Sequence, residues 1–246
     1  MIPKNHPRYN SLIEREKIKD AMKKSYLAES GMIAHGRGEA FDYLIEEKTS
    51  KTAEMAIKAS LAMLLLSENP VISINGNSTA LAIDQIIELS KKINAKVELN
   101  LFYRTDKRVK IIKELFEKKG FNKLLGTDPY NLKYINGLES PRATASKEGI
   151  YSADTILVML EDGDRTEILA QNGKFIIAID LNPLSRTAQM ANITIVDNIT
   201  RTIPLMIKIS DNLKNKTEKE LNKIINDFSN EKNLNDSLEL IRGKFK

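Results

Sequence analysis

The sequence contains no cysteine and only two histidines, His6 and His35, in 246 residues. The absence of cysteine excludes disulfides, thiolate catalysis and zinc or iron–sulfur sites with cysteine ligands. Two histidines are also too few for a histidine-rich metal site. Catalytic centres that depend on thiolates or on clustered imidazoles are therefore excluded.

Long apolar runs are missing as well. No stretch reaches the roughly 18 residues that a membrane span requires, and the first residues lack the apolar core of a signal peptide. We therefore expect a cytoplasmic protein without a membrane partner. Because 41% of the residues are hydrophobic, the chain can bury a sizeable core. We expect one α/β domain over residues 1–246, with an N-terminal helical segment (1–68), a parallel-sheet core (69–200) and C-terminal helices (201–246).

Two familiar phosphate-binding motifs are absent. The chain has no Gly-x-x-x-x-Gly-Lys-Ser/Thr loop, and no Gly-x-Gly-x-x-Gly follows its first expected strand. The segment Lys48-Thr-Ser-Lys-Thr52 resembles a loop of class I adenylate-forming synthetases, but the His-x-Gly-His motif that accompanies that loop is missing. We therefore expect this segment to be the N-terminal cap of a buried helix.

The net charge of +5 and the isoelectric point of about 9.1 raise the question of a nucleic-acid partner. Most lysines alternate with acidic residues on expected helices, as on solvated helix faces, and no basic stripe is rich in aromatics. We therefore expect no nucleic-acid partner. Several arginines instead stand in turn-like segments, where planar guanidinium groups suit phosphate or carboxylate ligands. These are Arg37, Arg104, Arg165, Arg186 and Arg201.

Short apolar runs alternate with helical patterns from residue 71 to residue 196. This alternation predicts a parallel, doubly wound sheet with flanking helices. The stretch 123–150 is interrupted by Asp-Pro, Asn-Gly and Ser-Pro dipeptides, so it supports no clear assignment. Strands are expected near 71–75, 96–102, 156–160, 175–180 and 193–196, and helices near 79–93, 106–119, 164–171 and 186–191.

The two ends of the chain are expected to be helical. Ser11 and Glu14 form a capping-box pattern for a helix over 12–29 that Gly31 would end, with a turn at 34–38. A second capping box, at Thr217 and Glu220, begins a helix in a tail that we expect to be a surface appendage. Further helices are expected at 51–67, 201–214 and 234–241.

Polar segments follow the expected strands directly. Because the carboxyl ends of parallel strands meet at one edge, where open α/β sheets bind ligands, these segments form a candidate site. They are Asn75-Gly-Asn77, Tyr103-Arg-Thr105 and the segments 161–166, 180–187 and 197–201.

Three segments each leave two interpretations open. Residues 36–38, Gly-Arg-Gly, form either an anion-binding turn or a helix connection that holds His35 in the core by hydrogen bonds. Asn75 to Asn77 form a simple turn or, as we favour, a helix start rimmed with neutral donors for phosphate or hydroxyl groups. Residues 161–166 either hold hydrated magnesium beside a triphosphate or form a self-neutralising, capped helix start.

Seven motifs together carry a resemblance to a known family. The chain is similar, over residues 3–205, to the archaeal 4-phosphopantoate–β-alanine ligases, also called phosphopantothenate synthetases. The resemblance implies a Rossmann-like homodimer of coenzyme A biosynthesis with ATP as co-substrate and Mg²⁺ carried by ATP. Its reaction would join 4-phosphopantoate to β-alanine through a phosphopantoyl adenylate, giving 4′-phosphopantothenate, AMP and diphosphate. The motifs are His6-Pro-Arg-Tyr9 and the segments 34–43, 70–77, 98–105, 160–166, 179–187 and 196–198.

The resemblance also implies a set of site residues. Arg37 and Arg186 would be catalytic, because they would screen the phosphates and stabilise charge on the α-phosphate. Asn77 and Arg104 are our own addition for binding 4-phosphopantoate, because they lie at adjacent strand ends and a phosphate needs a cation and donors. The implied ATP contacts are Arg15, Arg37, Asp180, Leu181, Asn182, Arg186, Thr187, Asn198 and Ile199.

Two functions of other classes remain as alternatives. A nucleotide or metabolite sensor would keep the segment 180–187 and Asn198 but would not need Asn77 and Arg104 as a second anion site. A nucleic-acid-binding protein would bind with steep salt dependence.

Overall fold

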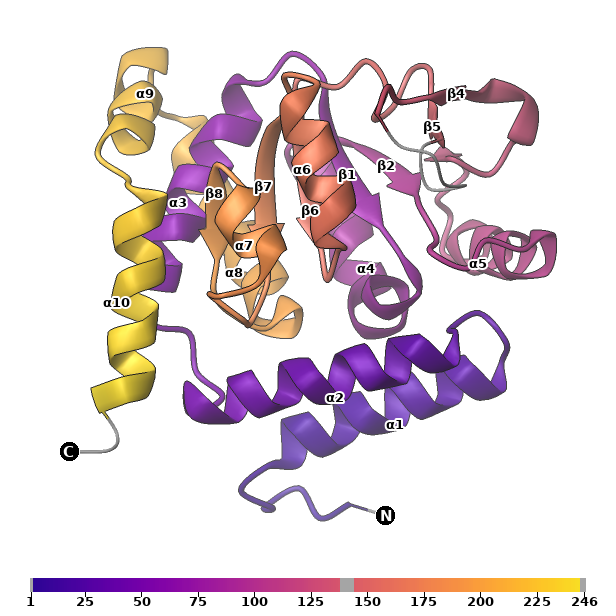
Figure 1. The fold of residues 1–246 in the computed structure, drawn as a ribbon, viewed down its shortest axis with the longest axis horizontal. Coiled ribbons are helices and arrows are strands. Elements are labelled where there is room, and N and C mark those ends of the chain that lie inside the picture. The colour runs from indigo at the N-terminus through magenta and orange to yellow at the C-terminus, as the bar shows by residue number, and fades with distance from the viewer. Residues whose placement is uncertain (1, 138–143, 244–246) are drawn as a thin grey trace.

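A parallel sheet forms the centre of the molecule. The computed structural model describes residues 2–137 and 144–243. In its six-stranded sheet the strand order is β3-β2-β1-β6-β7-β8, and every pairing is parallel (Figure 1). The expected doubly wound α/β architecture is confirmed. The strands are β1 (Pro70–Ile74), β2 (Lys96–Leu99), β3 (Leu124–Leu125), β6 (Thr155–Met159), β7 (Phe175–Ile179) and β8 (Ile193–Ile195).

Helices cover both faces of the sheet because neighbouring strand residues point to opposite sides. Ile72 and Leu157 belong to the larger apolar cluster, whereas Val71 and Ile156 belong to a second cluster on the other face. The larger cluster packs under α3 (Lys51–Leu66), α4 (Gly76–Lys92), α5 (Asp106–Lys118) and α8 (Ile199–Lys214). The second face carries α6 (Gly163–Gln171) and α7 (Arg186–Met190) (Figure 1).

The strand order places a switch point between β1 and β6. Ile72 of β1 pairs with Val97 of β2 on one side and with Leu157 of β6 on the other. The chain runs outward from β1 to β2 and β3, returns to β6, and then runs outward in the opposite direction. The loops after β1 and β6 therefore diverge, and a crevice forms outside their carboxyl ends.

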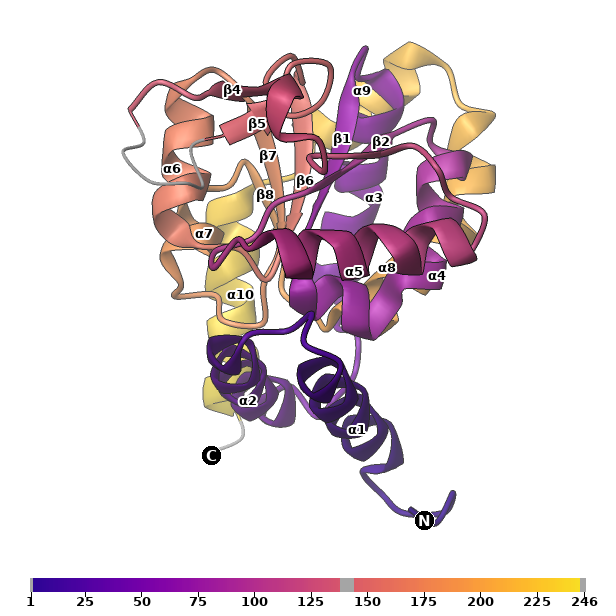
Figure 2. The same cartoon turned by 90° about the vertical axis from the view of Figure 1, so that its right-hand side faces the viewer.

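The N-terminal segment differs from expectation. Two helices, α1 (Tyr9–Lys23) and α2 (Glu29–Leu44), form a hairpin across the carboxyl end of the sheet (Figures 1 and 2). The helix predicted over 12–29 is present as α1, but its predicted bounds and its cap at Ser11 are wrong. The Ser11 hydroxyl donates to Glu39, and the Glu14 carboxylate accepts from Asn198. Both side chains form hydrogen bonds to other elements and do not cap a helix, so the capping-box pattern predicted the wrong helix start.

The predicted turn at 34–38 is also wrong, because all of it lies within α2. Gly31, which we expected to end a helix, lies in the first turn of α2. A Cβ atom at Gly31 would lie 2.6 Å from Leu27 Cδ1 and 2.7 Å from Asn77 Oδ1. The glycine therefore permits close packing of α2 on the start of α4, and this is a reason for glycine other than a turn.

The C-terminal tail is part of the packed body and is no appendage, contrary to expectation. It forms α9 (Glu218–Asn226), which starts at the predicted capping box of Thr217, and α10 (Asn230–Arg242). Asn230 Oδ1 accepts from the Thr194 N–H at 2.7 Å, and Asn233 Nδ2 donates to the Thr194 carbonyl at 2.8 Å. These bonds satisfy the open edge of β8.

Three further parts of the chain can be compared with the sequence analysis: the start of α3, the stretch 123–150 and the apolar character of the helices. The Ser50 hydroxyl accepts from the Ala53 N–H, so the predicted cap of the buried helix α3 is confirmed. The uncertain stretch 123–150 contains β3, the short helix η1 (Pro129–Asn131) and an antiparallel pair, β4 (Leu132–Tyr134) with β5 (Thr144–Ser146). The Ser-Pro dipeptide at 140–141 lies outside the described residues. Among the helices of the described ranges, none combines the length and the apolar character needed to cross a membrane.

Candidate active site

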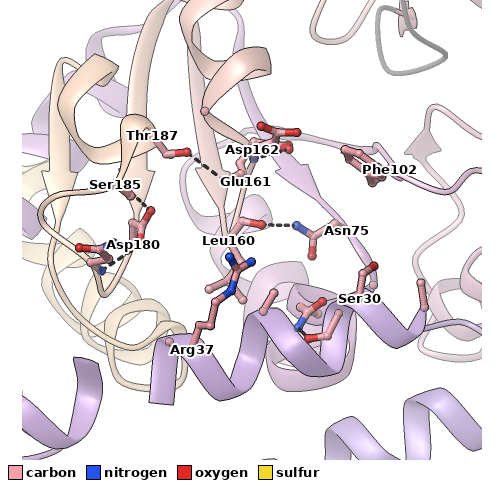
Figure 3. Close-up of a pocket in the computed structure, with 18 of the residues that line it drawn as sticks. Ser30, Arg37, Asn75, Phe102, Leu160, Glu161, Asp162, Asp180, Ser185 and Thr187 are labelled. Atoms are coloured by element: carbon pink, nitrogen blue, oxygen red, sulfur yellow. Dashed lines mark hydrogen bonds between the residues drawn. The ribbon is translucent and has the colours of Figure 1, made fainter. Parts of the chain in front are cut away.

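A cavity of about 740 Å³ lies at the switch point of the sheet. Its walls are the loops that follow β1, β2, β6 and β7, and α2 lies across the opposite side (Figure 3). The sequence-predicted site residues that line it are Arg37, Asn77, Asp180, Leu181, Asn182, Arg186 and Thr187. Arg15, Arg104, Asn198 and Ile199 are not among the lining residues.

The loop from β7 to α7 is held by its own hydrogen bonds. The Asp180 carboxylate accepts from the Ser185 hydroxyl at 2.5 Å and from the Asn182 N–H at 2.9 Å. Burial raises the pKa of Asp180, and these two bonds partly offset the effect. The Thr187 hydroxyl donates to the Glu161 carbonyl at 2.9 Å and so joins this loop to the one after β6 (Figure 3). This wall of the cavity is therefore fixed before any ligand arrives.

Arg186 forms ion pairs on this wall. Its guanidinium group contacts the carboxylates of Asp164 and Glu167 on α6. Its aliphatic stem packs on Gly163, where a Cβ atom would lie only 2.6 Å from Arg186 Cβ. The absence of a side chain at position 163 thus helps to position Arg186, while its charge is already countered by two carboxylates.

Arg37 projects from α2 into the cavity (Figure 3). No hydrogen bond or ion pair joins its side chain to another residue in the described part of the chain. The first of our two interpretations of residues 36–38, an anion-binding turn, is wrong, because these residues lie in mid-helix, where backbone N–H groups are used within the helix. The guanidinium group of Arg37 does line the cavity, as predicted, but Arg37 lies in a helix and not in a turn. The second interpretation, a helix connection that holds His35 by hydrogen bonds, is wrong too, because the segment is helical and the buried Nε2 of His35 has no partner among the described residues.

Asn75 joins the two halves of the cavity. Its Oδ1 accepts from the Ser78 N–H and caps α4, while its Nδ2 donates to the carbonyls of Met159 and Leu160 at 2.9 and 3.1 Å (Figure 3). Leu160 has a φ of 52°, the left-handed region that non-glycine residues rarely adopt. Asn77 is buried, and its Nδ2 donates to the Gly31 carbonyl at 2.8 Å. Its amide group therefore ties α2 to α4 as well as lining the cavity.

Arg108 is a cavity residue that the sequence analysis missed. It lies in the first turn of α5, and its Nε and Nη2 each donate to the Tyr26 carbonyl at 3.2 Å, while Nη1 donates to the Tyr103 carbonyl. Burial lowers its pKa. The sequence signal was its position three residues after the helix cap Thr105, beside a strand end. Because its neighbours are lysines and Asp106, it looked like part of a solvated helix face.

Three other arginines lie elsewhere than expected. Arg165 and Arg201 are helical rather than turn residues: Arg165 pairs with Glu161 at 3.0 Å, and Arg201 pairs with Asp42 at 2.5 Å and with Asp197. Arg104 Nη2 donates to the Gly126 carbonyl at 2.8 Å, on the far side of β2 from the cavity centre. Burial lowers the pKa of Arg104, and this effect is partly offset by the charges of two carboxylates.

The segment 161–166 forms a capped helix start. Asp162 accepts from the Asp164 N–H at 3.1 Å, and Arg165 neutralises Glu161. The second of our two interpretations is therefore the one that the structure shows. Within the described ranges, no group of three or more histidine, aspartate or glutamate side chains could hold a metal ion.

The remaining predicted contacts lie in a polar network between the hairpin and α8. Asn198 Nδ2 donates to Glu14 at 2.9 Å and to Asp42 at 2.8 Å, and its Oδ1 accepts from the Thr200 N–H. Arg15 pairs with Glu39 at 2.7 Å. Ile199 is buried in the core. In this arrangement the Asn198 side chain anchors the hairpin to the start of α8.

The fold and the cavity together define a class of protein. An open parallel sheet, a pocket at its switch point and several arginines at that pocket are typical of Rossmann-like α/β proteins that bind anionic ligands.

Comparisons with known proteins narrow this class to one family. A family model described as phosphopantothenate/pantothenate synthetase matches residues 52–244, so the chain belongs to that family. The 4-phosphopantoate–β-alanine ligase of Thermococcus onnurineus is 54% identical over 244 residues, which cover 99% of this chain and 93% of the relative. The ligase of the same name from Thermococcus kodakarensis is 52% identical with the same coverage. That from Methanosarcina mazei is 46% identical over 246 residues, 100% of this chain and 96% of the relative. The resemblance inferred from the motifs, and the expectation of an enzyme, are confirmed.

Proposed function

We propose that the protein joins 4-phosphopantoate to β-alanine with ATP, releasing AMP and diphosphate. The observation that carries the proposal is the cavity at the switch point, which is lined by arginines from three separate elements, α2, α5 and α7. Arginines on separate walls can bind two phosphorylated substrates at once. A sensor of one nucleotide needs cationic side chains at only one of these walls. The names of the relatives supply 4-phosphopantoate and β-alanine as the molecules that are joined, and ATP is the co-substrate that we propose for such a ligase.

The chemistry follows from the substrates. A carboxylate does not acylate an amine directly, because the leaving group would be oxide. Attack of the 4-phosphopantoate carboxylate on the α-phosphate of ATP forms the phosphopantoyl adenylate and expels diphosphate. Attack of the β-alanine amine on the acyl carbon then expels AMP. Arg37 and Arg186 reduce the repulsion between the anionic nucleophile and the triphosphate, and they stabilise charge that develops on the α-phosphate.

The predicted ATP contacts fall into two groups. We assign the triphosphate to the wall formed by Asp180, Leu181, Asn182, Arg186 and Thr187, which line the cavity. Magnesium would enter with ATP on the phosphate oxygens, and Asp162 is a cavity-lining carboxylate of the kind that Mg²⁺ accepts. Contacts from Arg15, Asn198 and Ile199, the homodimer and the cytoplasmic location stay predictions, as does a role for Arg104 in binding 4-phosphopantoate.

Product analysis tests the proposal. The purified protein is incubated with ATP, Mg²⁺, β-alanine and either 4-phosphopantoate or pantoate, and the nucleotides are resolved. We expect AMP and diphosphate only with 4-phosphopantoate, and without β-alanine we expect exchange of labelled diphosphate into ATP that depends on this acid. Formation of ADP and phosphate would contradict the adenylate route. Absence of any nucleotide product would favour a sensor.

A further inference from the structure

The cavity wall farthest from the β7–α7 loop carries a cation, Arg108, that has no counter-charge among residues 2–137 and 144–243. Arg108 is partly buried there, and its hydrogen-bond acceptors are the backbone carbonyls of Tyr26 and Tyr103. No carboxylate lies within ion-pair distance of Arg108 among the described residues. The only cause that shifts its pKa is burial, which disfavours the charged form. An anionic ligand would remove this electrostatic cost.

Two other arginines, Arg201 and Arg186, differ from Arg108 in this respect. Arg201, which is also partly buried, has its pKa raised by the carboxylates of Asp42 and Asp197 despite the cost of burial. Arg186 has two carboxylate partners. Arg186 and Arg201 thus have carboxylates within ion-pair distance, whereas Arg108 has none among the described residues.

Donors remain available beside Arg108. A guanidinium group has five N–H donors, and the contacts to Tyr26 and Tyr103 use three of them. A Cβ atom at Gly76 would lie 3.2 Å from Arg108 Nη2, so the guanidinium group adjoins the first residue of α4. The N–H groups of Gly76 and Asn77 open this helix of 17 residues and have no partner among the described residues. The positive end of the helix and the guanidinium group thus meet at one place.

The position of this donor group matches one end of an elongated substrate. In the strand order, β2 and β7 are separated by β1 and β6, so the two cavity ends are about 14 Å apart at a spacing of about 4.8 Å per strand. Arg37 lies between these ends (Figure 3). An acid with its carboxylate near Arg37 would meet the α-phosphate of ATP on the β7 side and extend its own phosphate toward α5.

We propose that Arg108, with the N–H groups that open α4, binds the phosphate of the acid substrate and selects the phosphorylated acid over pantoate. The inference rests on the proposed function, because it takes 4-phosphopantoate as that acid. It assigns the substrate's phosphate to a residue one helical turn beyond Arg104. The guanidinium group of Arg108 lines the cavity, whereas that of Arg104 is directed to Gly126.

The test compares Arg108→Gln with Arg104→Gln, because Arg104 is the residue that the sequence analysis predicted for the same phosphate. Both variants remove a partly buried guanidinium group that donates to backbone carbonyls, but only Arg108 lines the cavity. For Arg108→Gln we expect the KM for 4-phosphopantoate to rise tenfold or more. The KM for ATP and the inhibition constant of pantoate, used as a competitor, should change less than twofold. Arg108→Lys keeps the charge but loses the fork, so it should give an intermediate loss.

Direct calorimetric titration of 4-phosphopantoate and of pantoate, without ATP, separates this inference from the proposed function. If ligation fails but Arg108→Gln still loses binding of 4-phosphopantoate selectively, the function falls and the inference stands. Equal losses for both acids would overturn the inference, because Arg108 would then act only by holding Tyr26. A selective loss in Arg104→Gln instead, or a wild-type protein that does not distinguish the two acids, would overturn it too. Should Arg108→Gln fail to fold, the same comparison is made with Arg108→Lys.

Discussion

The two ends of the cavity differ in how their charges are arranged. At the β7 end, Arg186 is paired with Asp164 and Glu167, and Asp180 accepts two hydrogen bonds within its own loop. At the β2 end, the partners of Arg108 in the described part of the chain are backbone carbonyls. One end is electrostatically complete without ligand, and the other is not. We infer that a ligand displaces existing partners at the first end and supplies a missing partner at the second.

The energetic consequences of this difference follow from exposure. The side chain of Arg186 is 55% exposed and that of Asp164 is 67% exposed, so their ion pair is of the kind that contributes at most about 1 kcal/mol. A triphosphate can displace such partners at little cost. At Arg108 no partner has to be displaced, so binding of an anion should gain the full strength of a charge-assisted hydrogen bond, about 1.5–3 kcal/mol.

The largest effect is expected at Arg37, which lies between the two ends and serves both substrates. Replacing Arg37 with Ala should lower kcat/KM for ATP and for 4-phosphopantoate by roughly ten- to a hundredfold, because a charge-assisted contact worth about 1.5–3 kcal/mol is lost. The melting temperature should hardly change, since its side chain has no hydrogen bond to the described protein. Steady-state kinetics with each substrate and thermal denaturation check both expectations. A large drop in melting temperature would mean that Arg37 is structural, and unchanged kinetics would remove it from the site.

A smaller effect, confined to the β7 end, is expected at Gly163. In Gly163→Ala the new methyl group would lie 2.6 Å from Arg186 Cβ and 2.9 Å from its Cγ, so Arg186 must move. We expect the KM for ATP to rise about three- to tenfold while the KM for 4-phosphopantoate changes less than twofold. Gly36→Ala is the matched control, because nothing lies within 4 Å of its Cβ position. That variant should keep both KM values and gain about 0.5–1 kcal/mol of stability in mid-helix. If Gly163→Ala raised both KM values equally, the assignment of ATP to the β7 end and of 4-phosphopantoate to the β2 end would be contradicted.

Most of the sheet was predictable from the sequence because its signals are local. Strands β1, β6 and β7 are apolar runs followed at once by polar residues, and those residues do line the cavity. The hairpin α1–α2 was not predictable in the same way. Glycines such as Gly31 and Gly38 are typical of turns, so the sequence favoured a turn here. Gly31 instead allows two helices to pack closely, and only the folded chain shows which neighbour it approaches.

Site residues in the loops that follow strands could be predicted from the sequence. Site residues that are positioned by contacts between segments far apart in the sequence could not. Arg37 and Arg186 were identified from their motifs, although the expected turn around Arg37 was wrong. Arg108 was missed, because its environment comes from Tyr26, 82 positions away in sequence. The residues next to Arg108 in the sequence do not indicate that its guanidinium group is partly buried. They also do not indicate that it has no carboxylate partner among the described residues.

The smallest effect is expected from releasing Arg186, and it tests the inference that its partners are displaced by ATP. In the double variant Asp164→Asn with Glu167→Gln, the side chains keep their size but lose the charges that hold the guanidinium group. Because the pair with Asp164 is exposed on both sides and the pair with Glu167 is exposed at Arg186, we expect the KM for ATP to fall only about two- to threefold, with stability nearly unchanged. The gain should shrink as salt is added, because salt already screens such pairs. ATP titrations at low and high ionic strength measure this, and the KM for 4-phosphopantoate serves as the internal reference from the other end. A rise in the KM for ATP would show that the two carboxylates position Arg186 productively or take part in binding magnesium with the nucleotide. In that case the β7 end would be preorganised for ATP rather than merely neutral in its absence.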